Sequence, residues 1–278
     1  MYQNGGRVRL YKYCDERGIQ IFKNSSIKVS SPSELNDPFD CKPVPDTWSP
    51  ESVAELKRQI TQSSDLGRSL LAGILHPKLP FGTDLRKAKQ DWLDTLDRTV
   101  RNHEEVMRHM ELSYAGVAII CLTELKNHHL MWAHYANSHQ GMVIELESDG
   151  VFKSPEEATY TNRLYCVDYA EDRPIFRFDG ISPGAFTTKG TVWQHEKEWR
   201  VLYFSSQFDV QNIGGRDIRL RPIPPECIKT VYMGCMITAS NRNSLIELVN
   251  QDRWKHIKVF QMRLNPKSFE IHEEPILH

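Results

Sequence analysis

The chain has 278 residues, of which 40% are hydrophobic and 10% aromatic, and its formal net charge is −1. These values are typical of a folded globular protein with a sizeable core. They give no basic surface for nucleic acid, and no apolar run approaches the roughly 18 residues of a membrane-spanning helix. The six cysteines form no C-x-x-C pair, which argues against a disulfide framework or a zinc ribbon. The N-terminus lacks the apolar segment of a signal peptide, so we expect a cytoplasmic protein with no membrane partner.

Short strands and a few helices follow one another irregularly along the chain. Period-two patterns predict strands at 8–13, 27–30, 117–122, 142–146, 164–169, 199–204, 218–221, 228–233 and 256–262. Helical patterns predict helices at 127–138, 183–193 and 239–249, and a longer charged helical region at 49–114. Because strands and helices do not alternate strictly, we expect an α+β fold with a mixed or antiparallel sheet. The lack of repeats predicts a single domain, 1–278, with the helical insertion 49–114.

The stretch 121–147 is rich in His, Tyr, Trp and Met. A helical period places one methionine and several aromatic and imidazole side chains on one face, namely His128, Met131, Trp132, Tyr135 and His139. Gly141 then stands where a left-handed helix cap is expected. So many aromatic and imidazole side chains are unusual on the surface of a helix. The segment is therefore either a core element or the wall of a site.

The histidines of this stretch do not predict a metal site. His129, His134 and His139 recur every five residues, which spreads them around a helix, whereas helical zinc pairs lie four residues apart. We therefore expect no metal.

The loop SSPSELNDPFD at 30–40 is a second candidate. Asn36 and Asp37 stand before a proline, where their side chains can bond the backbone of a stiff turn. A structural turn and contact with a ligand both fit this pattern.

The third candidate is WQHEKEWR at 193–200. Period-two geometry places Glu196, Glu198 and Arg200 on one face at the start of an apolar strand. Neighbouring carboxylates raise each other's proton affinity, and Arg200 and Lys189 counter this effect. The pair therefore fits acid/base chemistry or a salt-bridged strand end. Phosphate-loop, dinucleotide-binding and serine-hydrolase motifs are absent.

Several of these motifs together resemble a bacterial family, the domain of unknown function family 2971. They are LYKY at 10–13, the 30–40 loop, CLTE at 121–124, LMWAHYANSHQGMVIE at 130–145, WQHEKEWR at 193–200 and PPECIKTVYMG at 224–234. The resemblance covers most of the chain outside 49–114 and implies no particular activity.

More distantly, the chain resembles ADP-ribosyltransferases. These enzymes carry a basic residue on a first strand, then an aromatic or hydroxyl site, and a late Glu-x-Glu. The resemblance puts Lys12 and Tyr13 in the first place, His134 and Tyr135 in the second, and Glu196 and Glu198 in the third. The Ser-Thr-Ser motif is absent, since Pro32 follows Ser31.

This resemblance implies cleavage of NAD, taken as a substrate, at its nicotinamide–ribose bond by a toxin, defence or regulatory factor. Glu198 would stabilise the oxocarbenium charge and Glu196 would orient or deprotonate the nucleophile. Tyr13 or Tyr135 would stack on nicotinamide, and Lys12 or His134 would meet phosphate or ribose oxygens. Asn36 and Arg200 are further candidates for binding NAD or another nucleotide. The acceptor, protein or nucleic acid, and the oligomeric state stay open.

Two alternatives remain. The chain is a non-catalytic nucleotide- or protein-binding module whose glutamates form structural ion pairs, or it is a metal-dependent nuclease or hydrolase. The latter needs a third acidic or imidazole group beside Glu196 and Glu198, for which Glu145 is the candidate.

Overall fold

The computed structural model describes residues 9–45, 50–62, 84–101, 114–147, 162–176, 183–213 and 215–276. Its longer strands are β1 (Arg9–Cys14), β2 (Ser26–Val29), β4 (Val117–Thr123), β5 (Met142–Glu147), β10 (Glu198–Phe204), β11 (Val210–Ile213), β12 (Arg216–Pro222), β13 (Ile228–Met233), β14 (Lys258–Leu264) and β15 (Ile271–Pro275). Its short strands are β3 (Val44–Pro45), β6 (Leu164–Cys166), β7 (Asp168–Ala170), β8 (Ile175–Phe176) and β9 (Thr188–Gly190). Its helices are α1 (Ile19–Asn24), α2 (Pro50–Gln62), α4 (Leu85–Arg101), α6 (His129–Tyr135), α7 (Gly184–Thr187) and α8 (Ala239–Val249).

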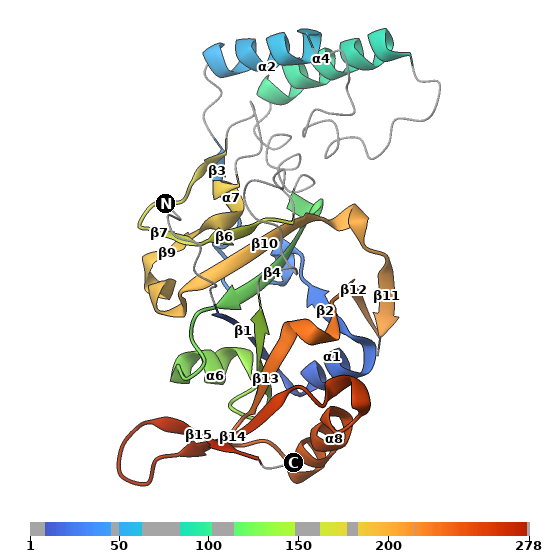
Figure 1. Ribbon diagram of the computed structural model, residues 1–278. Helices are drawn as coiled ribbons and strands as arrows, with labels where there is room; N and C mark the ends of the chain where they lie inside the picture. Colours follow the sequence, from blue (N-terminus) through green and yellow to red (C-terminus); the bar gives the residue numbers. More distant parts are fainter. Residues whose placement is uncertain are drawn as a thin grey trace.

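A large mixed sheet forms the centre of the molecule (Figure 1). Within the described residues it has eight strands in the order β15-β14-β13-β5-β1-β4-β10-β6. Only β13 and β14 of these strands pair in parallel, and the other pairs are antiparallel. The expected α+β fold with a mixed sheet is therefore confirmed.

One face of this sheet carries the main hydrophobic core. Side chains that alternate along β1, β4, β5, β10 and β13 point into it, where they pack against α1 and α8. Phe22 of α1 contacts Trp254 edge to face, with ring centroids 5.4 Å apart. The Trp254 indole nitrogen also donates to the Phe22 carbonyl over 2.9 Å. This burial anchors the C-terminal half of the chain to its first helix.

Helix α6 covers the opposite face, across β1, β5 and β13 (Figure 1). Trp132 is fully buried there, and Tyr13 of β1 meets it edge to face at 5.4 Å. The indole of Trp132 donates to the carbonyl of Lys126 over 2.8 Å, which satisfies its only polar group. The helical face predicted from Met131, Trp132 and Tyr135 thus holds α6 against the sheet.

Strands β1 and β4 are neighbours that pair over a very short length. They are in register only at Tyr11 and Thr123, whereas β1 pairs with β5 along all six of its residues. On the other side, β4 pairs with β10 along all seven of its residues. The sheet therefore opens between β1 and β4, and this opening leads into the candidate site.

Smaller sheets surround the large one. Strand β2 joins β12 and β11, and its neighbour Ser30 bonds the backbone of Ile119 in β4. Strand β3 pairs with β8, and β7 pairs with β9, both in parallel. The β7–β9 pair places Tyr169 beside Lys189, and both residues contact Glu198.

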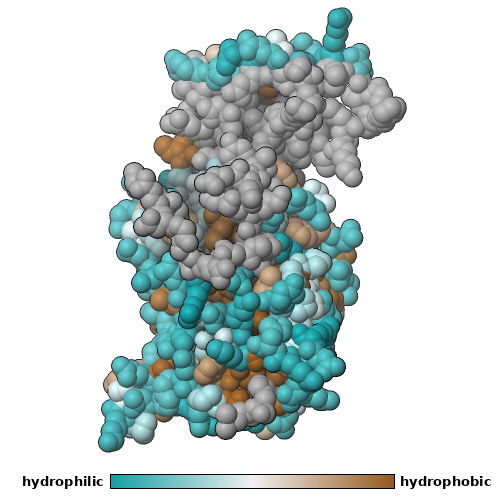
Figure 2. Space-filling model, in the orientation of Figure 1, coloured by the Kyte–Doolittle hydropathy of each residue, from teal (hydrophilic) through white to brown (hydrophobic). Residues whose placement is uncertain are grey.

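Helices α2 and α4 lie side by side at one end of the molecule (Figure 1). Ile60 and Leu96 belong to a second hydrophobic cluster, which also includes Phe186. Lys57 and Asp97 form an ion pair at 2.7 Å. Figure 2 shows a hydrophilic outer face over these helices. Both lie inside the range 49–114, but residues 46–49, 63–83 and 102–113 are outside the described residues, so the single-domain arrangement stays a prediction. No helix among the described residues is long and apolar enough to cross a membrane.

Three local predictions were wrong. The range 183–193 is not one helix, because α7 ends at Thr187 and the strand β9 and a 3₁₀ helix, Thr191–Glu196, follow it. Strand β10 begins at Glu198, so Glu196 lies in the 3₁₀ helix and not on the strand. Lys197, at φ 44°, takes the left-handed conformation that separates the two elements.

Gly141 is the third wrong prediction. The left-handed residues after α6 are Asn137, Ser138 and His139, with φ of 44°, 52° and 65°. A Cβ atom at Gly141 would lie 2.1 Å from the Cys14 carbonyl oxygen. Close approach of two backbones therefore requires this glycine.

Candidate functional site

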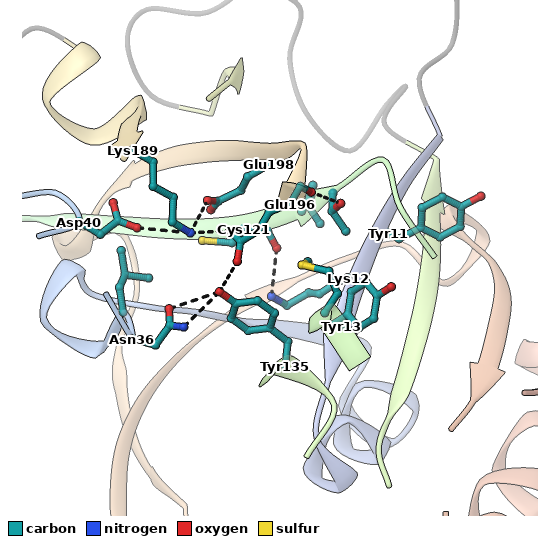
Figure 3. A pocket seen from close by; sticks show the side chains of 14 residues that line it. Tyr11, Lys12, Tyr13, Asn36, Asp40, Cys121, Tyr135, Lys189, Glu196 and Glu198 are labelled. Atoms are coloured by element: carbon teal, nitrogen blue, oxygen red, sulfur yellow. Dashed lines mark hydrogen bonds and ion pairs between the residues drawn. The ribbon is translucent and has the colours of Figure 1, made fainter. Parts of the chain in front are cut away.

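A pocket lies where β1 and β4 separate. It encloses a cavity of about 100 Å³, and its walls include Tyr11, Lys12 and Tyr13 of β1 and Cys121 and Thr123 of β4. Glu198 of β10, Glu196, Lys189, Tyr135, Asn36 and Asp40 complete its polar lining. Figure 3 shows polar side chains converging from separate parts of the chain, namely those of Asn36, Asp40, Tyr135, Lys189, Glu196 and Glu198, whereas the Tyr11 ring points away from them. The pocket thus brings together the two glutamates and the tyrosine of α6.

The ammonium group of Lys189 is the centre of this arrangement. Its Nζ lies 2.5 Å from Glu196 Oε2, 3.1 Å from Glu198 Oε2 and 3.8 Å from Asp40 Oδ2 (Figure 3). Only 3% of the Lys189 side chain is exposed, and its Nζ also lies 4.8 Å from the centre of the Trp193 ring. A buried ammonium needs such partners to stay charged.

Arg200 supports the acids from beneath. Its guanidinium is fully buried and binds Glu198 at two atoms, with Nε 2.8 Å from Oε1 and Nη2 2.9 Å from Oε2. It binds Asp40 in the same two-pronged manner, at 2.8 and 2.6 Å. Its Nη1 also donates to the carbonyl of Phe186 over 2.8 Å. This planar, forked geometry is the one that arginine offers to two carboxylates at once.

The charges set the protonation of the pocket. Burial alone would raise the pKa of Glu198, but the positive charges of Arg200 and Lys189 outweigh burial and hold this pKa at about 2. Burial works against the charged form of Lys189, yet Glu198, Tyr135 and Glu196 raise its pKa above the ordinary value. Glu198 is therefore a fixed anion and Lys189 a fixed cation at neutral pH.

Tyr135 connects α6 to the acids. Its hydroxyl donates to Glu196 Oε1 over 2.6 Å, and the amide of Asn36 donates to the same hydroxyl over 3.2 Å. Burial raises the pKa of Tyr135, so the hydroxyl keeps its proton. Glu196 thus bonds a hydroxyl through one oxygen and the ammonium of Lys189 through the other.

Hydrogen bonds to the backbone of residues 196–198 hold Glu196 in this position. The hydroxyl of Thr123 donates to the Glu196 carbonyl over 2.5 Å, and the amide of Glu124 donates to the Lys197 carbonyl over 3.3 Å. The amide of Glu198 donates to the hydroxyl of Tyr169 over 2.8 Å. These bonds replace the regular strand geometry expected for Glu196, and they turn both carboxylates toward Lys189.

Rings pack α6 against the 3₁₀ helix on the outside of the pocket. The imidazoles of His128 and His195 stack with centroids 5.1 Å apart, and His134 meets Trp193 edge to face at 6.4 Å. The same two elements supply Tyr135 and Glu196. The ring contacts therefore hold in place the two elements whose side chains share the 2.6 Å hydrogen bond.

Six of the eight site residues predicted from the sequence line this pocket, namely Lys12, Tyr13, Asn36, Tyr135, Glu196 and Glu198. His134 does not, because it is exposed on the outer side of α6. Arg200 does not either, since it is buried beneath the acids and its donors are occupied there. Neither residue lines this pocket, and their contact with a nucleotide stays a prediction.

Sequence reasoning missed the central roles of Asp40 and Lys189. Asp40 closes the loop motif 30–40, whose neighbour Asp37 forms the expected structural turn by accepting from the Phe39 amide over 2.9 Å. Lys189 was considered only as a counter-charge to the two glutamates. The only signal in the sequence that points to Asp40 is an acid at the end of a turn that contains Pro32 and Pro38.

Glu145 is not the third acid of this site. It lies on β5, where Tyr232 donates to it over 3.4 Å and Arg9 forms an ion pair with it at 3.8 Å. Asp40 takes the place proposed for it. Within the described residues, no three His, Cys, Asp or Glu side chains are arranged to hold a metal ion.

A family model matches part of the chain. Residues 131–201 match the family model described as "Protein of unknown function (DUF2971)", which confirms the family resemblance. This segment runs from α6 to the start of β10 and contains Tyr135, Lys189, Glu196, Glu198 and Arg200. No curated protein and no solved structure matches the chain.

Proposed function

With the DUF2971 match as the premise, we propose that this protein binds NAD in the pocket and cleaves its nicotinamide–ribose bond, as an ADP-ribosyltransferase or a glycohydrolase. The observation that carries the proposal is the pair Glu196 and Glu198 on one wall, both bonded to Lys189. Lys12, Tyr13, Asn36 and Tyr135 line the same cavity. The distant resemblance to ADP-ribosyltransferases, based on the Glu-x-Glu spacing and on the residues before it, points the same way.

The chemistry needs an anion that stays charged. When the bond between the ribose C1′ and the nicotinamide nitrogen breaks, its electron pair leaves with nicotinamide and positive charge develops on the ribose. Glu198, whose pKa is about 2, offers a permanent negative charge to this oxocarbenium ion. A preorganised charge of this kind lowers the barrier without reorganisation during the reaction.

The second carboxylate, Glu196, accepts a hydrogen bond and then the proton from the nucleophile. Glu196 Oε1 accepts the hydroxyl of Tyr135, and this is the bond that an acceptor hydroxyl or water would make. When the nucleophile attacks C1′, its proton passes to Glu196 and then to solvent. With water as the acceptor, NAD and water yield ADP-ribose, nicotinamide and a proton.

The aromatic walls suit the leaving group. Tyr13 and Tyr135 line the cavity, and a phenol ring offers a flat face to a nicotinamide ring. The acceptor is a protein or a nucleic acid, and a cytoplasmic role as a toxin, defence or regulatory factor is part of the proposal.

A specific observation favours a second candidate, a binding module without turnover. Glu198 has only 6% of its side chain exposed, and Arg200 and Lys189 occupy its oxygens. In this reading the acids are structural ion pairs, and the pocket recognises a nucleotide or a protein group.

The test is NAD consumption, with released nicotinamide followed by chromatography in buffer and in bacterial lysate. We expect Glu198→Gln to lower release about 100-fold or more and Glu196→Gln to lower it as well. The matched control is Glu274→Gln, which removes an exposed acid paired with Arg263 at 2.7 Å and should leave release unchanged.

The melting temperature of each variant separates loss of the site from loss of the fold. Release that persists in a folded Glu198→Gln would exclude the assigned role of Glu198. NAD binding by wild type without any release would support the binding module.

A further inference from the structure

The charges of the ion-pair network around Lys189 and Arg200 do not balance. Among the described residues, three carboxylates, those of Asp40, Glu196 and Glu198, share two cations, Lys189 and Arg200. Tyr135 adds no charge because it keeps its proton. The contact network therefore carries one excess negative charge at the wall of the cavity. An excess charge in a buried network is costly unless a counter-charge meets it.

Lys12 is a separate cation on the same cavity. Its Nζ donates to the backbone carbonyl of Cys121 over 3.4 Å, and it forms no ion pair with a carboxylate in the part of the chain that the structure describes. In Figure 3 it extends from β1 toward the cavity, where a dashed line marks its bond to the Cys121 carbonyl. The pocket thus presents an anionic region and a cationic group at different places on its wall.

Building on the proposed function, we propose that this charge separation selects the substrate as a zwitterion. The cationic pyridinium ring of an oxidised nicotinamide nucleotide faces the acids, and its 5′-linked phosphate faces Lys12. The reduced dihydropyridine ring is neutral, so it loses the attraction of the acids. The pocket therefore discriminates the oxidised from the reduced dinucleotide at the binding step.

The physical basis is the low dielectric of the site. Glu196 and Lys189 are each no more than 3% exposed at their side chains, so water screens their charges weakly. The excess charge acts on any ring held against Tyr13 and Tyr135, because both line the same cavity as the acids. A positive charge on the ring therefore contributes more binding free energy in this pocket than it would at the protein surface.

The experiment measures binding by calorimetry with a substrate analogue that cannot react. The probe is carbocyclic NAD, in which a methylene group replaces the oxygen of the nicotinamide ribose, in its oxidised and reduced forms. We expect wild type to bind the oxidised form at least about tenfold more tightly. Nicotinamide mononucleotide should likewise bind more tightly than nicotinamide riboside, which lacks the phosphate.

Two variants separate the two halves of the recognition. Glu196→Gln removes the excess charge and should bring the oxidised and reduced forms to similar affinity. Lys12→Met should abolish the advantage of the mononucleotide over the riboside but keep the preference for the oxidised ring. The control Lys255→Met removes a cation whose side chain is 68% exposed, paired with Asp252, and should change neither ratio.

The outcomes are distinct. Equal affinity of wild type for the oxidised and reduced analogues would overturn the inference even if NAD is cleaved. A preference for the oxidised form that Glu196→Gln abolishes would support it even if no nicotinamide is released, in which case only the proposed cleavage fails. If Glu196→Gln does not fold, Asp40→Asn removes one charge from the same network and takes its place in the comparison.

Discussion

The hydroxyl of Tyr135 lies 2.6 Å from Glu196 and ties helix α6 to the 3₁₀ helix that precedes β10. Sixty-one positions of sequence separate the two residues, and both line the same cavity. This bond joins two of the three segments that the sequence marked as candidates. In the proposed reaction, a nucleophile would take this position on Glu196.

Tyr135→Phe tests this relationship. The variant leaves the ring in place and removes the hydroxyl, while Glu196 keeps its bond to Lys189. We expect a loss of stability of about 1 kcal/mol and a change in nicotinamide release of about tenfold or more. Chemical denaturation and the release assay measure the two effects separately. An unchanged release rate would remove Tyr135 from the site.

Arg200→Met should be far more damaging. It leaves Asp40 and Glu198 buried without the guanidinium that binds both, and breaking a buried ion pair from one side costs about 3–5 kcal/mol. The control Arg263→Met breaks an exposed pair with Glu274, which should cost far less because water screens both charges. Urea unfolding of both variants checks the contrast, and equal losses would contradict the account of Arg200.

Gly141→Ala tests the close approach behind α6. The added Cβ would lie 2.1 Å from the Cys14 carbonyl oxygen, whereas at Gly190 the nearest atom would be 3.8 Å away. We expect Gly141→Ala to lower the free energy of unfolding by more than about 2 kcal/mol and Gly190→Ala to change it little. Similar melting temperatures for the two variants would show that the backbone at Gly141 shifts to accept a Cβ atom without a loss of stability.

Stability should fall when the pH falls below about 6.5. Burial, followed by nearby histidines, lowers the pKa of His128 and of His139 below the ordinary 6.5. Between the lowered values and 6.5 the unfolded chain binds protons that the folded chain does not, so acidification favours unfolding in this window. Above 6.5 these residues add no pH dependence.

The measurement is the free energy of unfolding from pH 8 to pH 5. The double variant His128→Gln with His139→Gln should show a shallower decline than wild type. His256→Gln serves as the control, since its ring already bonds the Pro225 and Ile228 carbonyls. An identical decline in the double variant would assign the pH dependence to other groups.

Much of the fold could be predicted from local patterns. Helix α8 has the bounds predicted for it, 239–249, and β13 has those predicted at 228–233. In both, a full-length periodic pattern coincides with a core contact, so local preference and packing agree. Strands β11 and β15 were missed. All four residues of β11 are exposed, so it has no buried face to impose an alternating pattern.

The candidate site was predicted in part. The sequence by itself determined the first candidate residues, because Glu196 and Glu198 stand two positions apart beside an apolar strand and Tyr135 falls on the buried face of a helix. Only the tertiary structure decided that Asp40 joins them, that Lys189 lies at their centre and that Arg200 stays beneath. Residue spacing determines which face of one element a side chain takes, whereas the convergence of Asp40, Lys189 and Glu198 depends on loops and strand pairings that connect distant segments.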